Sequence, residues 1–476
     1  MTSLRKVYDD HPKTVVFASG ALIRILAALV FPRLPDLLTL RPEISTPVNS
    51  FKRLQEGLFL HERGLDPYDG GIFHQAPLLL SLFSLVPNPS SWIGRLISIV
   101  LYTGLDLLSA DCLYSIADSG AGYKTRLFTS PRSDRVWKPI SVAAAYLFNP
   151  YTLLACLGRP TSVFTTTLIL LSISHACQRQ TVTAAFALAM ASYNSFHPIL
   201  LLPPVGLLCY DRLCINSSNS QPFTTNGDTS FAPQNGIKIS TDQRNHPQPL
   251  PFALKFTTTF TVFLTFLLLL SRLILPSWNF LPAVYLTPLT LPDLTPNPGL
   301  WWYFFIEMFD AFRSFFLGVF ALHMLSYSVP FCLRFQKQPL VAVVLMMGVV
   351  AIFEPYANAG TAGAWLSSLG LVGHLFEGEY HVLLISYGPI NVALVSSAYR
   401  YTFPALAALL YSTFLGPAFH HLWIYAGSGN ANFFYAITLV WSLALLIILT
   451  DTVYSALRDE WEAERPEGKG KDVGQI

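Results

Sequence analysis

The chain has 476 residues, of which 52% are hydrophobic and only 12% carry a charged side chain. Soluble domains carry about 25% charged residues, so this composition excludes a soluble protein and predicts an all-α, multi-pass membrane protein. The net charge of +2 excludes a broad basic surface for nucleic acid.

Long apolar stretches recur along the chain and predict one polytopic membrane domain over residues 1–476. A membrane-spanning helix needs about 20 apolar residues. Counting stretches that approach this length, together with shorter or interrupted ones, we expect about twelve spans. The segment 380–398 is either a further span or a helix outside the membrane. The clear spans are 14–31, 92–117, 139–157, 161–177, 252–275, 300–330, 402–420 and 433–451, and the weaker ones are 181–195, 198–210, 339–353 and 362–377.

Basic residues predict the orientation of the chain. Residues 119–138 contain five Lys or Arg and one acid, and three basic residues precede the first span. Loops rich in Lys and Arg stay in the cytosol, so both termini of a twelve-span chain are expected there. An even number of spans then separates the N-terminus from 119–138. The apolar stretch 76–86 is too short to cross, so we expect a re-entrant or in-plane helix within the first luminal loop, 32–91.

That first luminal loop carries scattered acidic residues. A sugar transferase that acts on a lipid-linked donor needs a carboxylate as its base, and an acidic pair would be typical. No D-x-D, D-D or E-D pair occurs here. Asp66 and Asp69 are the best candidates for a base, and a simple turn over 66–71 is the alternative. The acids of the loop are Asp36, Glu43, Glu56, Glu62, Asp66 and Asp69.

Polar residues also occur inside two of the following spans. Asp106 and Asp111 share span 92–117 with Arg95. Ionisable residues inside a membrane are costly and are functional candidates by default, so a transporter path would include them. Asn149, followed directly by a proline, predicts a kink in span 139–157.

Two polar segments lie outside the spans. Residues 215–250 are rich in Ser, Asn, Gln, Thr and Pro, a composition that predicts a disordered linker, and the span count places it in the cytosol. Residues 452–476 are rich in charge and predict a cytosolic tail.

Span 300–330 begins with a run of aromatic residues and contains acids. Glu307, Asp310 and Ser314 follow the i, i+3, i+7 spacing of one helix face. Arg313 lies three residues after Asp310 and is expected to pair with it. A functional role for these acids and a purely internal ion pair are both open.

Few residues suggest a ligand by their type alone. Arg334 and Lys337 follow span 300–330 on the predicted cytosolic side. They are candidate contacts for a phospholipid headgroup, and ordinary cytosolic bases are the alternative.

The six cysteines form no C-x-x-C pair and no P-loop occurs, so we expect no metal and no cofactor.

A short polar loop, 427–432, separates the last two spans. Asn430 and Asn432 carry uncharged donors and acceptors, and aromatic residues on both sides suit a membrane–water boundary. This chemistry fits a hydroxyl-rich headgroup on a lipid. A plain turn between two spans is the alternative.

At these residues the chain resembles the PIG-U family, whose members are subunits of glycosylphosphatidylinositol (GPI) transamidase. The stretch 422–439, with Trp423, Asn430 and Asn432, is similar to the C-terminal signature of that family. The stretch 292–309 resembles its central motif, and 148–151 matches further upstream.

The resemblance implies a fold and a function. The fold would be the scaffold of lipid-linked, GT-C-like GPI mannosyltransferases. The function would be that of a non-catalytic subunit in the endoplasmic reticulum membrane, which binds the GPI lipid while a partner supplies the nucleophile. Asn430 and Asn432 would contact the GPI headgroup, and Arg313 and Phe315 would be further lipid contacts. The implied partners are the caspase-like PIG-K, PIG-T, PIG-S and a multi-span attachment subunit.

Two rival functions remain. An active mannosyltransferase of GPI synthesis would need Asp66 or Asp69 as its base. A transporter or lipid flippase would use Asp106, Asp111, Glu307 and Asp310 along its path, and inverted repeats, which are not evident in the sequence, would favour it.

Overall fold

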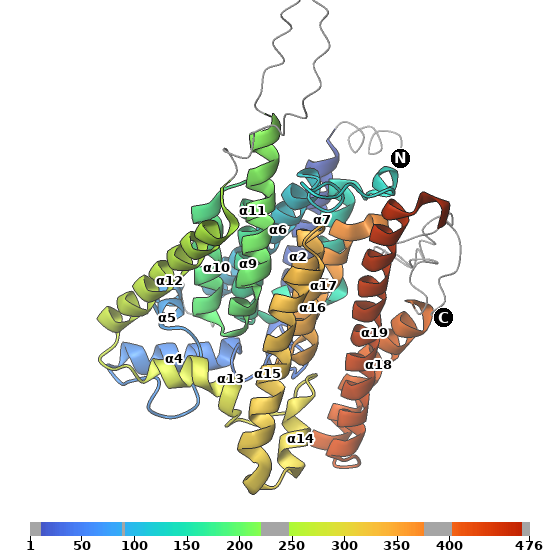
Figure 1. Cartoon of the computed structure of the whole chain (residues 1–476). Helices are drawn as coiled ribbons and strands as arrows, with labels where there is room; N and C mark the ends of the chain where they lie inside the picture. The colour runs from blue at the N-terminus through green and yellow to red at the C-terminus, as the bar shows by residue number, and fades with distance from the viewer. Residues whose placement is uncertain (1–10, 88–90, 220–246, 376–401, 469–476) are drawn as a thin grey trace, which may run out of the picture.

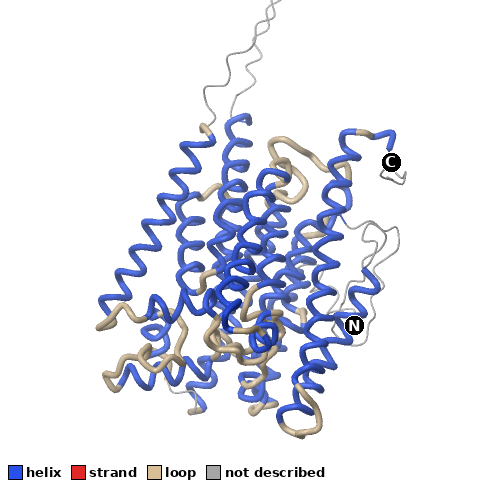
Figure 2. Tube along the Cα trace, turned by 60° about the horizontal axis from the view of Figure 1, so that its bottom comes forward, coloured by secondary structure: helices blue, strands red, loops and turns tan. Residues whose placement is uncertain are grey.

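A computed structural model describes residues 11–87, 91–219, 247–375 and 402–468, and this part of the chain is helical without a strand (Figures 1 and 2). The expected all-α, multi-pass class is therefore confirmed. Six segments are long and apolar enough to cross a membrane. Several other predicted spans correspond to shorter helices, and span 402–420 corresponds to the 23-residue helix α18 (Thr402–Ile424), which is not among the six. The count of about twelve therefore stays a prediction. The six are α2 (Pro12–Val30), α6 (Trp92–Asp118), His197–Ile215, which joins the short helix η2 (His197–Leu201) to most of α11 (Leu202–Asn219), α12 (Pro249–Ile274), α15 (Asp310–Arg334) and α19 (Ala431–Glu464).

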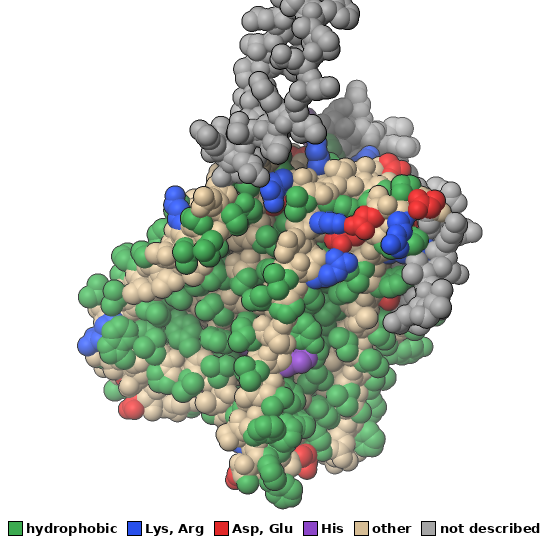
Figure 3. Space-filling view, viewed as in Figure 1, with side chains coloured by type: hydrophobic (Ala, Val, Ile, Leu, Met, Phe, Trp, Pro, Cys, Tyr) green, Lys and Arg blue, Asp and Glu red, His purple; other side chains and the backbone are tan. Residues whose placement is uncertain are grey.

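The long helices run between two ends of the molecule (Figure 1). The start of α2 and the end of α19 lie at the upper end, whereas α4 (Phe51–Glu62) and α5 (Pro77–Ser84) lie at the lower end. On the face in Figure 3, charged side chains gather near the upper end above a mostly hydrophobic band. The segment 76–86 contains the short helix α5, and its re-entrant or in-plane placement in a luminal loop stays a prediction. Which end faces the cytosol remains a prediction.

The expected kink at Asn149 is confirmed. Helix α7 (Pro139–Leu147) and helix α8 (Pro150–Gly158) meet at 52°. The side-chain oxygen of Asn149 accepts a hydrogen bond from Tyr151 N at 2.9 Å, and its amide donates to Gly363 O at 3.1 Å. The proline prevents a continuous helix, and the asparagine satisfies backbone groups that the break exposes.

The prediction of one continuous helix over 300–330 is wrong. Helix α14 (Trp301–Glu307) ends before α15 begins, because Met308 and Phe309 adopt extended backbone angles with ψ of 133° and 136°. Glu307 and Asp310 therefore do not share one helix face, and both are exposed. The expected pair with Asp310 is not among the ion pairs of the described residues. Arg313 instead donates to Leu291 O at 2.7 Å.

The acids inside α6 have partners on α2. Arg24 Nε lies 2.7 Å from Asp106 Oδ2, and both side chains are buried. Tyr146 OH donates to the other oxygen of Asp106 at 3.2 Å. Asp111 pairs with Lys13 at 2.6 Å. These contacts tie α2 to α6 and give both acids a structural role.

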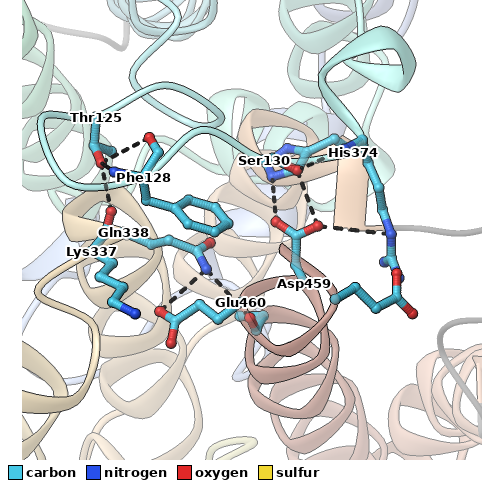
Figure 4. Close-up of polar contacts among 11 residues, drawn as sticks. Thr125, Phe128, Ser130, Lys337, Gln338, His374, Asp459 and Glu460 are labelled. Atoms are coloured by element: carbon cyan, nitrogen blue, oxygen red, sulfur yellow. Dashed lines mark hydrogen bonds and ion pairs between the residues drawn. The ribbon is translucent and has the colours of Figure 1, made fainter. Parts of the chain in front are cut away.

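The charged segment after residue 452 begins as a continuation of α19, which runs to Glu464. Its acids enter a set that we call the C-terminal polar cluster, which consists of Ser130, Arg132, His374, Asp459 and Glu462. Figure 4 labels Ser130, His374 and Asp459 of this cluster. Ser130 Oγ donates to Asp459 at 3.0 Å, and Arg132 Nη2 lies 2.7 Å from Glu462. These hydrogen bonds and ion pairs hold the basic loop 119–138 against the end of α19. Of the predicted linker 215–250, residues 220–246 lie outside the described residues, as does the segment 380–398.

Candidate functional site

The polar loop 427–432 is the tip of a helical hairpin formed by α18 (Thr402–Ile424) and α19. Gly427 turns the chain with a φ of +63°, a conformation that glycine adopts without steric cost. Asn430 is the N-cap of α19, and its side-chain oxygen accepts from Phe433 N at 3.3 Å. Asparagine is favoured at this position because its oxygen satisfies a free backbone N–H.

The central motif packs directly against this hairpin. The Trp302 ring stacks on Trp423 at 6.1 Å between centroids, and Tyr303 lies 4.6 Å from Tyr435. Tyr303 OH donates to the side-chain oxygen of Asn432, 129 residues away in the sequence. The two motifs that the sequence presents separately therefore form one site, which we call the asparagine tip, made of Trp302, Tyr303, Trp423, Asn430 and Asn432.

Both asparagines are exposed at this tip. Each uses its side-chain oxygen within the protein, Asn430 as a helix cap and Asn432 toward Tyr303. Neither amide NH₂ group donates to the described part of the chain. The site therefore offers two amide donors to an external acceptor, such as a sugar hydroxyl or a phosphate oxygen.

Arg313 and Phe315 lie on α15. Arg313 contacts α14 at Phe305, beyond Trp302 and Tyr303 of the asparagine tip. The Arg313 guanidinium donates to Leu291 O at 2.7 Å and to Phe305 O at 3.4 Å. The Phe315 side chain is 64% exposed. Within the described residues, neither side chain contacts Asn430 or Asn432.

A crevice with a volume of about 150 Å³ opens next to the asparagine tip. It separates the α18–α19 hairpin from α8 and from the loop after α3 (Leu34–Thr39). Phe434, one helical turn after Asn430, belongs to its lining. Most of that lining is apolar, so the crevice suits an acyl chain better than a sugar. Its walls include Leu38, Ile44, Tyr151, Leu154, Gly416, Phe434, Ile437 and Trp441.

One ion pair lines the crevice. Arg41 donates to both carboxylate oxygens of Glu43, at 3.2 Å from Nε and at 3.0 Å from Nη2. The sequence counted Glu43 among the loop acids but gave no reason to single out Arg41. Only the fold brings this loop beside α18 and α19.

Two carboxylates near the central motif have shifted pKa values. Burial favours a higher pKa for Asp293, but hydrogen bonds from Thr295 and Arg53 outweigh it and hold the pKa below its usual range. Burial raises the pKa of Glu354 to about 8. Asp293 is therefore a fixed negative charge that pairs with Arg53 at 2.7 Å, while Glu354 is largely protonated at neutral pH.

Asp66, the first candidate for a transferase base, belongs to a hydrogen-bonded turn. One oxygen accepts from Tyr68 N at 3.0 Å, and the other accepts from Ser277 Oγ at 2.7 Å. Asp69 is exposed in the same turn. No group of three His, Cys, Asp or Glu side chains among the described residues is placed to hold a metal.

Arg334 and Lys337 lie at the other end of the molecule from the asparagine tip. Arg334 Nη1 lies 2.7 Å from Glu460, and Lys337 donates to Glu464. The hydrogen bond to Glu464 raises the pKa of Lys337. Both bases therefore face carboxylates of α19.

Comparisons with known proteins agree along almost the whole chain. The family model described as "GPI transamidase subunit PIG-U" matches residues 18–441. The human protein named GPI-anchor transamidase component PIGU is 30% identical over 94% of both chains. The Saccharomyces cerevisiae protein named GPI transamidase component GAB1 is 33% identical over 95% of this chain and 96% of its own. The GAB1 homologue of Schizosaccharomyces pombe is 30% identical over 93% of both chains.

Proposed function

This chain belongs to the PIG-U family of GPI transamidase subunits, and on that premise we propose that it binds the GPI lipid and presents its glycan for attachment to proteins. The chain itself is non-catalytic in this proposal. The nucleophile belongs to a caspase-like partner, PIG-K, and PIG-T, PIG-S and a multi-span attachment subunit complete the complex. The scaffold is a GT-C-like membrane fold of about twelve spans in the endoplasmic reticulum, with both termini cytosolic.

The observation that carries this proposal is the position of the asparagine tip beside an apolar crevice. A GPI molecule joins a polar glycan to acyl chains, so its site needs polar donors next to apolar surface. The amides of Asn430 and Asn432 would bind hydroxyl or phosphate oxygens of the headgroup. The crevice between the α18–α19 hairpin and α8 would take an acyl chain.

Arg313 and Phe315 have secondary roles in this proposal. Arg313 holds α14 through Phe305 O, so it would position the aromatic wall of the tip. Phe315, exposed on α15, would contact an acyl chain.

Neither rival function gains support from a specific observation. A mannosyltransferase needs a carboxylate that is free to accept a proton. Asp66 already accepts hydrogen bonds in its turn, so of the two candidates only the exposed Asp69 remains. A transporter path through Asp106 would require a charge that can exchange partners, and that carboxylate is buried against Arg24.

Replacing both asparagines is expected to weaken the binding of the GPI headgroup by about 1–3 kcal/mol, since each net hydrogen bond contributes roughly 0.5–1.5 kcal/mol. Alanine at position 430 would also remove a helix cap, at a cost of about 1 kcal/mol. The informative variant is therefore Asn430→Ser with Asn432→Ala, because serine retains a capping oxygen. Cells that depend on this variant should display fewer GPI-anchored proteins, measured by flow cytometry, although the complex still assembles.

The matched control is Tyr303→Phe. It removes the hydroxyl that donates to Asn432 and leaves both amides in place, so display should stay near the wild-type level. Wild-type display in the Asn430→Ser, Asn432→Ala variant would refute the contact.

Filling the crevice is expected to impair binding of the lipid part. A Cβ at Gly416 would lie 3.7 Å from Ile437 Cγ2, so Gly416→Leu places its side chain in the crevice without a backbone clash. Overpacking typically costs about 1–3 kcal/mol, and here we expect that cost to weaken the binding of the acyl chain. The amount of GPI that copurifies with the complex, measured by mass spectrometry, should fall roughly 5- to 150-fold.

Gly318→Leu on α15 is the control for this change. No atom lies within 4 Å of a Cβ at that position, so the same substitution should leave GPI copurification unchanged. Equal retention of GPI in both leucine variants would contradict the assignment of the crevice to an acyl chain.

A further inference from the structure

A second cleft lies at the upper end of the molecule. It runs between the junction of α15 with α16 (Pro339–Phe353) and the last turns of α19, and its volume is about 590 Å³. Sites for small molecules and cofactors usually measure about 300–1,000 Å³. This cleft is therefore large enough for a lipid headgroup and is separate from the asparagine tip.

The lining of this cleft changes from apolar to charged along α19. Tyr454 comes first and is 47% exposed, and Trp461 and Glu464 follow two and three turns later. On the opposite wall, Leu333 is 63% exposed and directly precedes Arg334. A phospholipid at a membrane surface is surrounded first by apolar, then by aromatic and then by charged groups. The lining of this cleft follows the same order.

The charges of the cleft are paired rather than uniformly positive. Arg334 Nη1 lies 2.7 Å from Glu460 Oε2, and Lys337 donates to Glu464 (Figure 4 shows Lys337 and Glu460). Arg458 is also part of the lining, but its Nε donates to the buried Glu462 at 2.8 Å. An anionic headgroup would be attracted by the bases and repelled by Glu464. A headgroup with a negative and a positive group can place the first on the bases and the second on Glu464.

We propose that this cleft binds the headgroup of a zwitterionic phospholipid. Its phosphate lies on Arg334 and Lys337. Its ammonium group lies on Glu464, because the Arg458 and Arg465 guanidiniums already lie over the ring of Trp461. Leu333 and Tyr454 contact the first part of the acyl chains. This site is independent of the GPI site, from which it is separated by the length of the bundle (Figure 1).

The test uses the full chain purified in detergent and mixed with dioleoylphosphatidylcholine or dioleoylphosphatidylglycerol. Native mass spectrometry measures how much of each lipid stays bound. The wild type should retain more phosphatidylcholine than phosphatidylglycerol. Lys337→Gln should reduce the retention of both lipids about threefold, the effect typical of one exposed charge pair. Glu464→Gln should abolish the preference for phosphatidylcholine, because the net charge of the lining rises from +1 (three bases, two acids) to +2.

Two variants outside the cleft serve as matched controls. Lys138→Gln and Glu467→Gln remove one base and one acid from exposed positions that do not line the cleft and should leave retention unchanged. Lys337 and Glu464 are themselves 42% and 60% exposed, so their variants should fold. Equal retention of the two lipids by the wild type would overturn the proposal. The same holds if Lys337→Gln behaves like Lys138→Gln.

Discussion

Replacing Asp106 by alanine is expected to lower the free energy of unfolding by about 3–5 kcal/mol, the usual cost of removing one partner from a buried ion pair. Arg24 and Asp106 are 0% and 1% exposed. Without the carboxylate, the guanidinium retains hydrogen bonds to Leu147 O at 2.8 Å and to Gly20 O at 3.1 Å, but its charge has no counterion. Thermal unfolding of the detergent-purified chain should show a large drop in Tm.

The double variant Arg24→Met, Asp106→Leu separates this explanation from a simple packing defect. An ion pair replaced as a whole by apolar side chains is often close to neutral, so the double variant should be more stable than Asp106→Ala alone. A cycle that also includes Arg24→Met measures the coupling between the two positions. If the two single effects merely add, the ion pair does not account for the loss of stability.

Replacing Arg132 by alanine is expected to release the basic loop 119–138 from the end of α19. Arg132 is 2% exposed and contacts Glu462, also 2% exposed, and it lies 3.7 Å from Asp459. Its removal leaves the buried Asp459 without its cation, while Glu462 retains only Arg458, again at a cost of about 3–5 kcal/mol. Limited trypsin digestion should cut the loop at Lys124 or Arg126 much faster than in the wild type.

Arg135→Ala is the control for this experiment. Arg135 is an exposed base three residues further along the same loop, so its removal should leave the rate of cleavage at Lys124 and Arg126 unchanged. A wild-type digestion pattern and Tm in Arg132→Ala would show that the C-terminal polar cluster does not hold the loop.

Much of the fold could be predicted because hydropathy is a local property. A stretch of about 20 apolar residues indicates a helix in lipid whatever the rest of the chain does, and α2, α6, α12 and α19 follow that rule. The kink after Asn149 was predictable for the same reason, since proline acts on its own helix.

The break between α14 and α15 was not predictable in this way. No glycine or proline lies at Met308 or Phe309, and the local pattern favours one continuous helix. In the folded chain, Trp301 and Phe305 pack on Phe320 at 4.9 Å and 5.6 Å between ring centroids. That packing folds α14 back along α15, so tertiary contacts outweigh the local preference.

The candidate site, like the fold, could be predicted only in part from the sequence. The side chains of Asn430 and Asn432 were recognisable from their polar loop between aromatic segments. Their environment was not, because Tyr303 and the crevice residue Arg41 come from distant parts of the sequence.

The sequence by itself determined the membrane class and the spans of greatest hydropathy, since each depends on composition within a short window. Only the tertiary structure decided which polar groups meet. Arg24 pairs with Asp106, 82 residues away in the sequence, and Arg132 pairs with Glu462, 330 residues away. Asp459, Glu460 and Glu462 of α19 look like part of a charged tail in the sequence and are buried in the fold. A buried charge is stable only beside its partner, and that partner is chosen by the packing of helices rather than by neighbouring residues.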